Sequence, residues 1–429
     1  MQFPSTLTSL ISVCLLALGS VASADPINNA PQLVVDADFE GGSARVLEID
    51  QKNGHISIMP DGDPTRGWPA WWFFRVSGLT HNQALKVSVF APSQILPNGV
   101  AGAGKPLDGS WALPSQATWS SDGKTWNRTP AGKRDGTGIT YELKSPGSEL
   151  WIAWGPPATP TALNGWMDQV AAKHDSVRTF VLAKTLEGRE VRGVRVASGD
   201  DSDRTRPVIW LHARQHAWES GSSWVARGIV QWLVGGSEDA AWVRSNTEVY
   251  VVPILDVDRA ATGDGGKESI PHDHNRDWSD RPHYPEIAAV QKKVRAWSDD
   301  NRLAVFVDLH NPSPNDGTAF FYVASNDVLS SARRSQRDRF LDVVHDRYDG
   351  EIPLTRETRS SGPGYHPLWH RMSRTWVTQH GNEDAIAVCL ETPWNLSRST
   401  TKGYESVGAG LAKGIAGFLQ ERCKAQEIR

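Results

Sequence analysis

Cysteine is scarce in this sequence, and so is any excess of charge of one sign. Lysine and arginine number 45 against 49 aspartates and glutamates, so the formal net charge is only −4 and the chain lacks the basic surface expected of a nucleic-acid-binding protein. Three cysteines occur, of which removal of an amino-terminal signal would leave Cys389 and Cys423. An oxidising compartment permits a disulfide between them, but Cys389 lies in an apolar run and is expected to be a buried free thiol.

The amino terminus carries an apolar run that is too short to span a bilayer comfortably. Residues 7–21 are apolar, and Ala22-Ser23-Ala24 follows as a cleavage pattern. Val13 before Cys14 argues against lipid anchoring, which favours a small residue there. Residues 1–24 are therefore predicted to be a signal peptide, and the mature protein to be secreted or periplasmic without a membrane anchor.

Residues 25–157 have the pattern of a β-domain. Short runs rich in β-branched and aromatic residues alternate with Gly, Pro, Asn and Asp. They predict an all-β sandwich whose core holds Tyr141 and many of the chain's 19 tryptophans, with carbohydrate contact as the alternative use of the tryptophans. No cluster of acids, bases or metal ligands lies there, so this domain is expected to orient, cover or recruit substrate.

Residues 158–429 have the pattern of an α/β domain. Strands are expected at 208–211, 249–254, 304–309, 319–323 and 385–390, a hairpin at 179–196, and helices at 161–172, 221–234, 285–297, 331–348 and 406–422. This alternation predicts a mixed, mostly parallel sheet with helices on both faces. No internal repeat or low-complexity tract interrupts it.

Three residues near the ends of these strands have the chemistry of a metal site. His216 and Glu219 lie in the turn after 208–211, where an α/β sheet places its ligands, and His310 follows the run 304–309. Two imidazoles and a carboxylate form a catalytic zinc site that leaves a position for water. We therefore predict one zinc ion per chain. Asp308 is a candidate partner of His310 in the surrounding shell, a role that strand alternation leaves open.

A carboxylate also follows the strand at 385–390. Glu391 would be costly to bury there unless it were paired or functional. Zinc-dependent hydrolysis requires a base that takes a proton from water and returns it to the leaving amine. We predict this role for Glu391; a strand-capping residue in a salt bridge is the alternative.

The loop between the ligands offers groups for a substrate carboxylate. Arg276 presents a planar fork of donors, and the amide of Asn275 can add another bond. A terminal carboxylate is what an exopeptidase must recognise. His272, His274 and His283 are expected to be solvated loop histidines and not a second metal site.

These motifs, in this order, resemble those of the M14 metallocarboxypeptidases. The segment 213–224, A-R-Q-H-A-W-E-S-G-S-S-W, is similar to the A-R-x-H-P-G-E-x-x-S-S-W of the cytosolic carboxypeptidase-like subfamily, whose members carry an amino-terminal β-sandwich. The resemblance implies the same roles for His216, Glu219 and His310 at zinc, Glu391 as base, and Asn275 with Arg276 at the terminal carboxylate. Members of the subfamily often favour acidic or polyglutamate tails, although an exported protein would not meet the intracellular targets.

The sequence also departs from the family pattern. Counting back from Asn275 at the subfamily's spacing places Gly266 where an arginine normally polarises the scissile carbonyl. Lys267 or Arg259 is expected to supply the positive charge that a developing oxyanion needs, unless rate or substrate class has shifted. Tyr365 is the candidate for the tyrosine that closes over substrate, and 311–313 replaces the usual H-G-H.

The sequence thus predicts a secreted zinc metallocarboxypeptidase that removes the carboxyl-terminal residue of peptides or proteins through a zinc-activated water. One alternative is a zinc amidase or deacylase acting on N-acyl amino acids or cell-wall peptides, which the missing arginine supports. Another is a tryptophan-rich binding protein with a decayed hydrolase domain.

Overall fold

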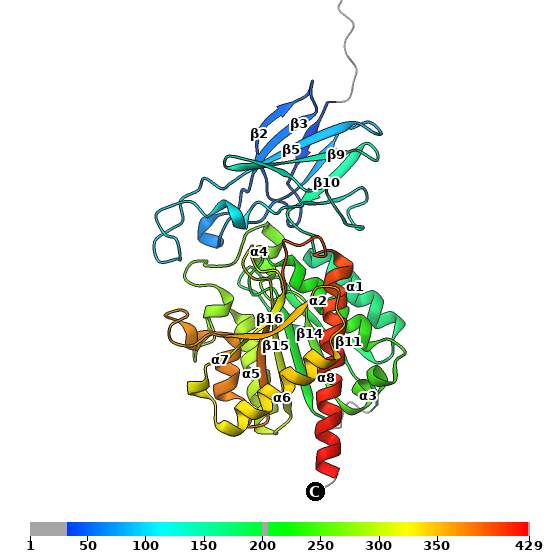
Figure 1. The fold of residues 1–429 in the computed structure, drawn as a ribbon, viewed down its shortest axis with the longest axis vertical. Coiled ribbons are helices and arrows are strands. Elements are labelled where there is room, and N and C mark those ends of the chain that lie inside the picture. The colour runs from blue at the N-terminus through cyan, green and yellow to red at the C-terminus, as the bar shows by residue number, and fades with distance from the viewer. Residues whose placement is uncertain (1–31, 200–204, 428–429) are drawn as a thin grey trace, which may run out of the picture. The chain divides into compact units, whose positions relative to one another are not determined.

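The computed structural model describes residues 32–199 and 205–427 (Figure 1). The predicted signal peptide, residues 1–24, lies outside the described residues. None of the described helices is long and apolar enough to cross a bilayer.

Residues 34–153 form two five-stranded sheets that share one core, which confirms the predicted all-β sandwich. The first sheet has the order β1 (Val34–Asp36), β4 (Phe73–Ser77), β10 (Glu149–Ala153), β6 (Thr118–Ser120) and β7 (Asn127–Arg128). The second has the order β2 (Arg45–Asp50), β3 (His55–Met59), β5 (Ala84–Phe90), β9 (Gly138–Lys144) and β8 (Lys133–Asp135). Apolar side chains of both sheets pack into one cluster around Trp72 and Tyr141.

An eight-stranded sheet organises the rest of the chain. Its order is β11 (Val177–Lys184), β12 (Glu190–Val196), β14 (Glu248–Val252), β13 (Val208–Ala213), β15 (Leu303–His310), β18 (Ile386–Glu391), β16 (Ala319–Val323) and β17 (Leu354–Ser360). The central strands β14, β13, β15 and β18 are parallel, whereas β11 and β12 form an antiparallel hairpin at one edge. The predicted mixed, mostly parallel sheet is confirmed.

Helices pack against both faces of this sheet. They are α1 (Pro160–Lys173), α2 (Ser220–Leu233), α3 (Glu238–Asn246), α4 (Val257–Thr262), α5 (Pro285–Asp299), α6 (Ser331–Arg347), α7 (Ser373–His380) and α8 (Thr401–Glu427). The connection from β13 leads through α2 to β14 on one side, and that from β14 leads through α5 back to β15 on the other. Because such crossovers are right-handed, α2 and α5 cover opposite faces. Helix α8 packs against α2 and α6, and α7 packs against α5 (Figure 1).

The two cysteines of the described part are both free, as expected. Cys389 is buried within β18, and Cys423 lies on the last helix.

Candidate active site

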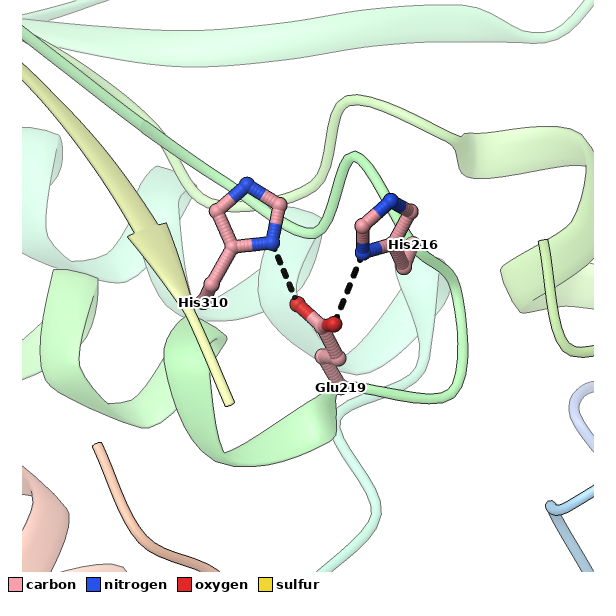
Figure 2. A group of neighbouring side chains, drawn as sticks. All are labelled: His216, Glu219 and His310. Atoms are coloured by element: carbon pink, nitrogen blue, oxygen red, sulfur yellow. Dashed lines mark hydrogen bonds and ion pairs between the residues drawn. The ribbon is translucent and has the colours of Figure 1, made fainter. Parts of the chain in front are cut away.

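Three side chains meet at the carboxyl ends of β13 and β15. Glu219 Oε1 lies 2.8 Å from His216 Nδ1, and its Oε2 lies 2.7 Å from His310 Nδ1 (Figure 2). All three side chains are buried, and their ligand atoms lie within 4.8 Å of one another. A carboxylate and two imidazole nitrogens that converge on one small space are a donor set that fits zinc. The fold therefore brings together the three residues predicted to bind the metal.

The charges of this cluster favour an ionised carboxylate. Burial would raise the pKa of Glu219, but the imidazoles of His310 and His216 outweigh it and lower this pKa to about 2. Burial would lower the pKa of His310, but Asp308 and Glu219 raise it well above its ordinary value. Glu219 is thus in the state that can bind a cation.

The turn that carries His216 and Glu219 is held from two directions. Arg214, in the left-handed region with φ of 58°, donates from Nε to the carbonyl oxygen of Ala217 at 2.9 Å. The Trp218 ring packs into the core of the β-domain, 5.2 Å from the Trp154 ring in an edge-on contact. Glu219 directly precedes α2 at the N-cap position but makes no capping bond, because its side chain points to the histidines.

Each histidine of the cluster has a buried aspartate behind it. Asp273 Oδ1 lies 3.5 Å from His216 Nε2, and Asp308 Oδ1 lies 2.9 Å from His310 Nε2. Carboxylates in this position orient metal-binding imidazoles and increase their basicity. The predicted proximity of Asp308 to His310 is confirmed.

A cavity of about 330 Å³ opens beside the cluster and is lined by the three metal donors, by Glu391 and by four of the residues predicted to bind substrate. Its lining includes His216, Glu219, His310, Asn275, Arg276, Lys267, Tyr365 and Glu391. Glu391 ends β18 directly beside His310 on the neighbouring strand. Burial raises the pKa of Glu391 to about 7, and its Oε2 has no hydrogen-bond partner among the described residues. A carboxyl group that titrates near neutrality can both take and give a proton.

Asn275 and Arg276 reach the cavity from a single turn of 3-10 helix, η3 (His274–Arg276). Both are buried. Arg276 Nη1 donates to the Asn275 carbonyl at 3.1 Å and lies 4.0 Å from Asp273, while its Nε has no partner among the described residues. A buried guanidinium with unused donors can bind a carboxylate.

Two known protein families match this chain. Residues 163–281 match the family of zinc carboxypeptidases, peptidase M14, and residues 35–154 match the cytosolic carboxypeptidase N-terminal domain. This chain is an M14 zinc carboxypeptidase. The matched segments include His216, Glu219, Asn275 and Arg276.

Several curated relatives of this carboxypeptidase are named cytosolic carboxypeptidases. Cytosolic carboxypeptidase 6 of Caenorhabditis elegans is 24% identical over 96% of this chain and 92% of its own length. Cytosolic carboxypeptidase 1 of Mus musculus is 25% identical over 90% of this chain, which spans only 34% of that protein.

Solved structures share the fold of this carboxypeptidase. A metallo-carboxypeptidase from Burkholderia cenocepacia has a TM-score of 0.73 at 17% identity, covering 91% of this chain and 100% of that one. A metallo-carboxypeptidase from Pseudomonas aeruginosa, in complex with (2-guanidinoethylmercapto)succinic acid, has a TM-score of 0.73 at 20% identity, covering 90% and 99%.

Position 266, where the family pattern has an arginine, has no room for a side chain in this carboxypeptidase. Gly266 has a φ of 78°, and a Cβ added to it would lie 2.5 Å from the backbone nitrogen of Ala217 and 2.7 Å from Asp256 Oδ2. Lys267 lines the cavity, with Nζ 5.5 Å from the centre of the Trp68 ring. Arg259 does not line it, because its guanidinium is buried against Asp256 and the Tyr284 hydroxyl. Of the two cations weighed from the sequence, Lys267 is the one at the site.

Tyr365 lies at the mouth of the cavity. Its side chain is 44% exposed, and its ring centre is 5.3 Å from that of Tyr322. A ring at the mouth is placed to contact a bound substrate.

Several further residues of the cavity wall were not predicted from the sequence, among them two arginines and two tryptophans. Arg374 and Arg359 come from α7 and β17, and Trp68 and Trp111 come from the β-domain. Arg359 is paired with Asp316 at 2.6 Å. Arg374 is only 2% exposed; its Nη2 contacts Met372 Sδ at 3.4 Å, and its Nε has no hydrogen-bond partner among the described residues. A helical pattern at 373–380 would have marked Arg374 as a buried cation, but α7 is too short to give one.

The β-domain also binds the segment that carries Lys267. The amide of Trp68 donates to the Lys267 carbonyl at 2.8 Å, Gly266 donates to the Arg66 carbonyl at 3.0 Å, and Ile270 donates to the Thr65 carbonyl at 2.8 Å. The side chain of Arg66 adds an ion pair with Asp264 at 2.5 Å. The expectation that this domain covers substrate agrees with its two tryptophans in the cavity wall.

The prediction of three solvated histidines was wrong for His274. This residue is 1% exposed and its Nε2 lies 2.6 Å from Glu286 Oε1, because α5 packs over the loop. His272 is partly exposed and His283 is exposed, as expected.

Proposed function

We propose that this carboxypeptidase releases the carboxyl-terminal residue of peptides, with His216, Glu219 and His310 holding one zinc ion. The observation that carries the proposal is the shared cavity, in which the metal donors, a near-neutral carboxyl group and an arginine with unused donors face one space. When bound, zinc would supply a Lewis acid that polarises the scissile carbonyl and makes water more acidic.

The residues of the chain would then divide the remaining work. Asn275 and Arg276 bind the terminal carboxylate and so place the last peptide bond beside Glu391. Glu391 takes a proton from the attacking water and returns it to the leaving nitrogen, which its pKa of about 7 allows. Lys267 supplies positive charge to the carbonyl oxygen in place of the arginine that position 266 cannot hold.

Arg374 in the cavity wall supports peptides that end in an acidic residue as the preferred substrates. Arg374 is buried in the cavity without a carboxylate partner among the described residues. An unpaired buried cation is costly unless a ligand completes it. A glutamate or aspartate side chain at the substrate terminus would provide that partner.

The test is zinc content together with release of free amino acids from a mixed peptide library, comparing the wild type with Glu391→Gln. We expect one zinc per chain in both proteins and release of acidic terminal residues by the wild type alone. Zinc without release of any terminal residue would favour the amidase or deacylase instead, which the glycine at position 266 supports. A folded protein that binds no zinc would favour a binding protein.

Export is a separate proposal that rests on residues 1–24 alone. The curated relatives are named cytosolic carboxypeptidases, and their names give export no support. Sequencing the amino terminus of the protein produced in its natural host tests it: a chain that begins at Asp25 supports export, and one that retains residues 1–24 contradicts it.

A further inference from the structure

Asp308, behind His310, is the centre of a buried polar network. It is 0% exposed, and four donor groups surround it. Its Oδ1 lies 2.9 Å from His310 Nε2 and 3.1 Å from His212 Nε2. Its Oδ2 accepts hydrogen bonds from Gln215 Nε2 at 2.6 Å and from the Ser373 hydroxyl at 2.5 Å.

Two tryptophans fix the direction of the bonds in this network. The indole N–H of Trp210 donates to His212 Nδ1 at 2.8 Å, and that of Trp278 donates to Gln215 Oε1 at 2.8 Å. An indole N–H can only donate, so His212 Nδ1 must carry a lone pair and the neutral ring must hold its proton on Nε2. For the same reason Gln215 must turn its amide nitrogen, not its oxygen, toward Asp308.

The same network fixes the orientation of the His310 ring. A lone pair on Nε2 would repel the carboxylate oxygen of Asp308 2.9 Å away, whereas an N–H there is attracted to it. The amide nitrogen of Asn275 also faces this Nε2, but at 3.4 Å, and it is uncharged. An N–H on Nε2 thus faces Asp308, and the ring turns Nδ1 toward Glu219, whose Oε2 lies 2.7 Å away.

We propose that Trp210, His212, Trp278, Gln215 and Asp308 are positioning residues that hold the His310 ring with Nδ1 turned toward the metal position. The inference rests on the proposed zinc site. Neither tryptophan lines the cavity, so each acts on the metal only through Asp308. Such partners in the shell around a metal site decide ligand orientation and metal affinity.

Zinc affinity, measured by competition with a chelator, tests the proposal without reference to activity. Asp308→Asn is expected to weaken zinc binding about 10- to 100-fold, and Trp210→Phe or Trp278→Phe about 3- to 10-fold. The matched control is Trp297→Phe, because Trp297 is a buried tryptophan 5.7 Å from Trp210 whose N–H bonds to no acceptor among the described residues. It is expected to leave the zinc affinity unchanged.

A double-mutant cycle separates a positioning role from general damage to the core. If Trp210 acts through Asp308, Trp210→Phe adds no loss of zinc affinity to a protein that already carries Asp308→Asn. An equal loss in both backgrounds, or an unchanged affinity in Trp210→Phe and Trp278→Phe, would overturn the proposal while leaving the zinc carboxypeptidase intact. A wild type that binds no zinc would overturn both.

The zinc-loaded wild type gives a second reading that does not depend on any variant folding. With ¹⁵N-labelled histidine, the nitrogen shifts of His212 should be those of the Nε2–H form. The Nδ1–H form would contradict the proposal.

Discussion

Replacing Gly266 by the arginine of the family pattern should damage this enzyme and not improve it. Residue 266 has a φ of 78°, and a non-glycine residue in the left-handed region costs about 1–2 kcal/mol. A Cβ there would also lie 2.5 Å from the Ala217 nitrogen, and overpacking of this kind costs about 1–3 kcal/mol. The sum is a loss of about 2–5 kcal/mol, which at roughly 2 °C per kcal/mol for a chain of this length lowers the Tm by about 4–10 °C.

The same substitution should reach the metal site, because Ala217 follows His216 directly. Thermal unfolding, zinc affinity and kcat/KM of Gly266→Arg are the measurements, and all three should fall. Gly165→Arg is the control, since Gly165 is an exposed glycine of α1 whose added Cβ would meet no atom within 4 Å. The reasoning is refuted if Gly266→Arg unfolds with the wild type and has a higher kcat.

Three other perturbations follow from the site. Lys267→Met should lower kcat about 10²- to 10³-fold with little change in KM, and Lys267→Arg should retain most of it, as steady-state kinetics will show. Arg374→Gln should raise KM for peptides that end in glutamate about 10- to 100-fold and leave peptides with apolar ends unaffected; a uniform change would remove Arg374 from the specificity pocket. Chelation of zinc present at a thousand times its Kd should remove about 4 kcal/mol of stability, seen as a Tm lower by about 8 °C. Glu219→Gln should show little of this shift.

The metal donors and Glu391 were predictable because each follows directly on a local signal. Apolar runs mark β15 and β18, and a polar residue at the end of a buried parallel strand lies at the edge where ligands bind. His216 and Glu219 needed only the turn after β13. The hydrophobic pattern therefore located both the strands and the chemistry at their ends.

Residues whose role depends on tertiary contacts gave no such signal. Trp68 and Trp111 look like core residues of a β-domain, and only the packing of that domain against the segment 262–270 places them in the cavity. The strand β17 carries polar residues on both faces at the edge of the sheet, so no alternation marks it. His274 resembles a loop residue until α5 brings Glu286 against it.

The segment that carries Gly266 and Lys267 is held from both sides. On one side Gly266 abuts Ala217 and Asp256 of the α/β domain, and on the other its amide and the Lys267 carbonyl bond to residues 66 and 68 of the β-domain. A segment fixed in this way cannot shift to admit a side chain at 266, and Lys267 at the next position is the cation that it brings to the cavity. The centre of the Trp68 ring lies 5.5 Å from the Lys267 ammonium nitrogen, a contact that favours an ammonium group at the cavity. The β-domain therefore forms part of the cavity wall, and the lack of room at 266 follows from the contacts of this segment with Ala217 and Asp256.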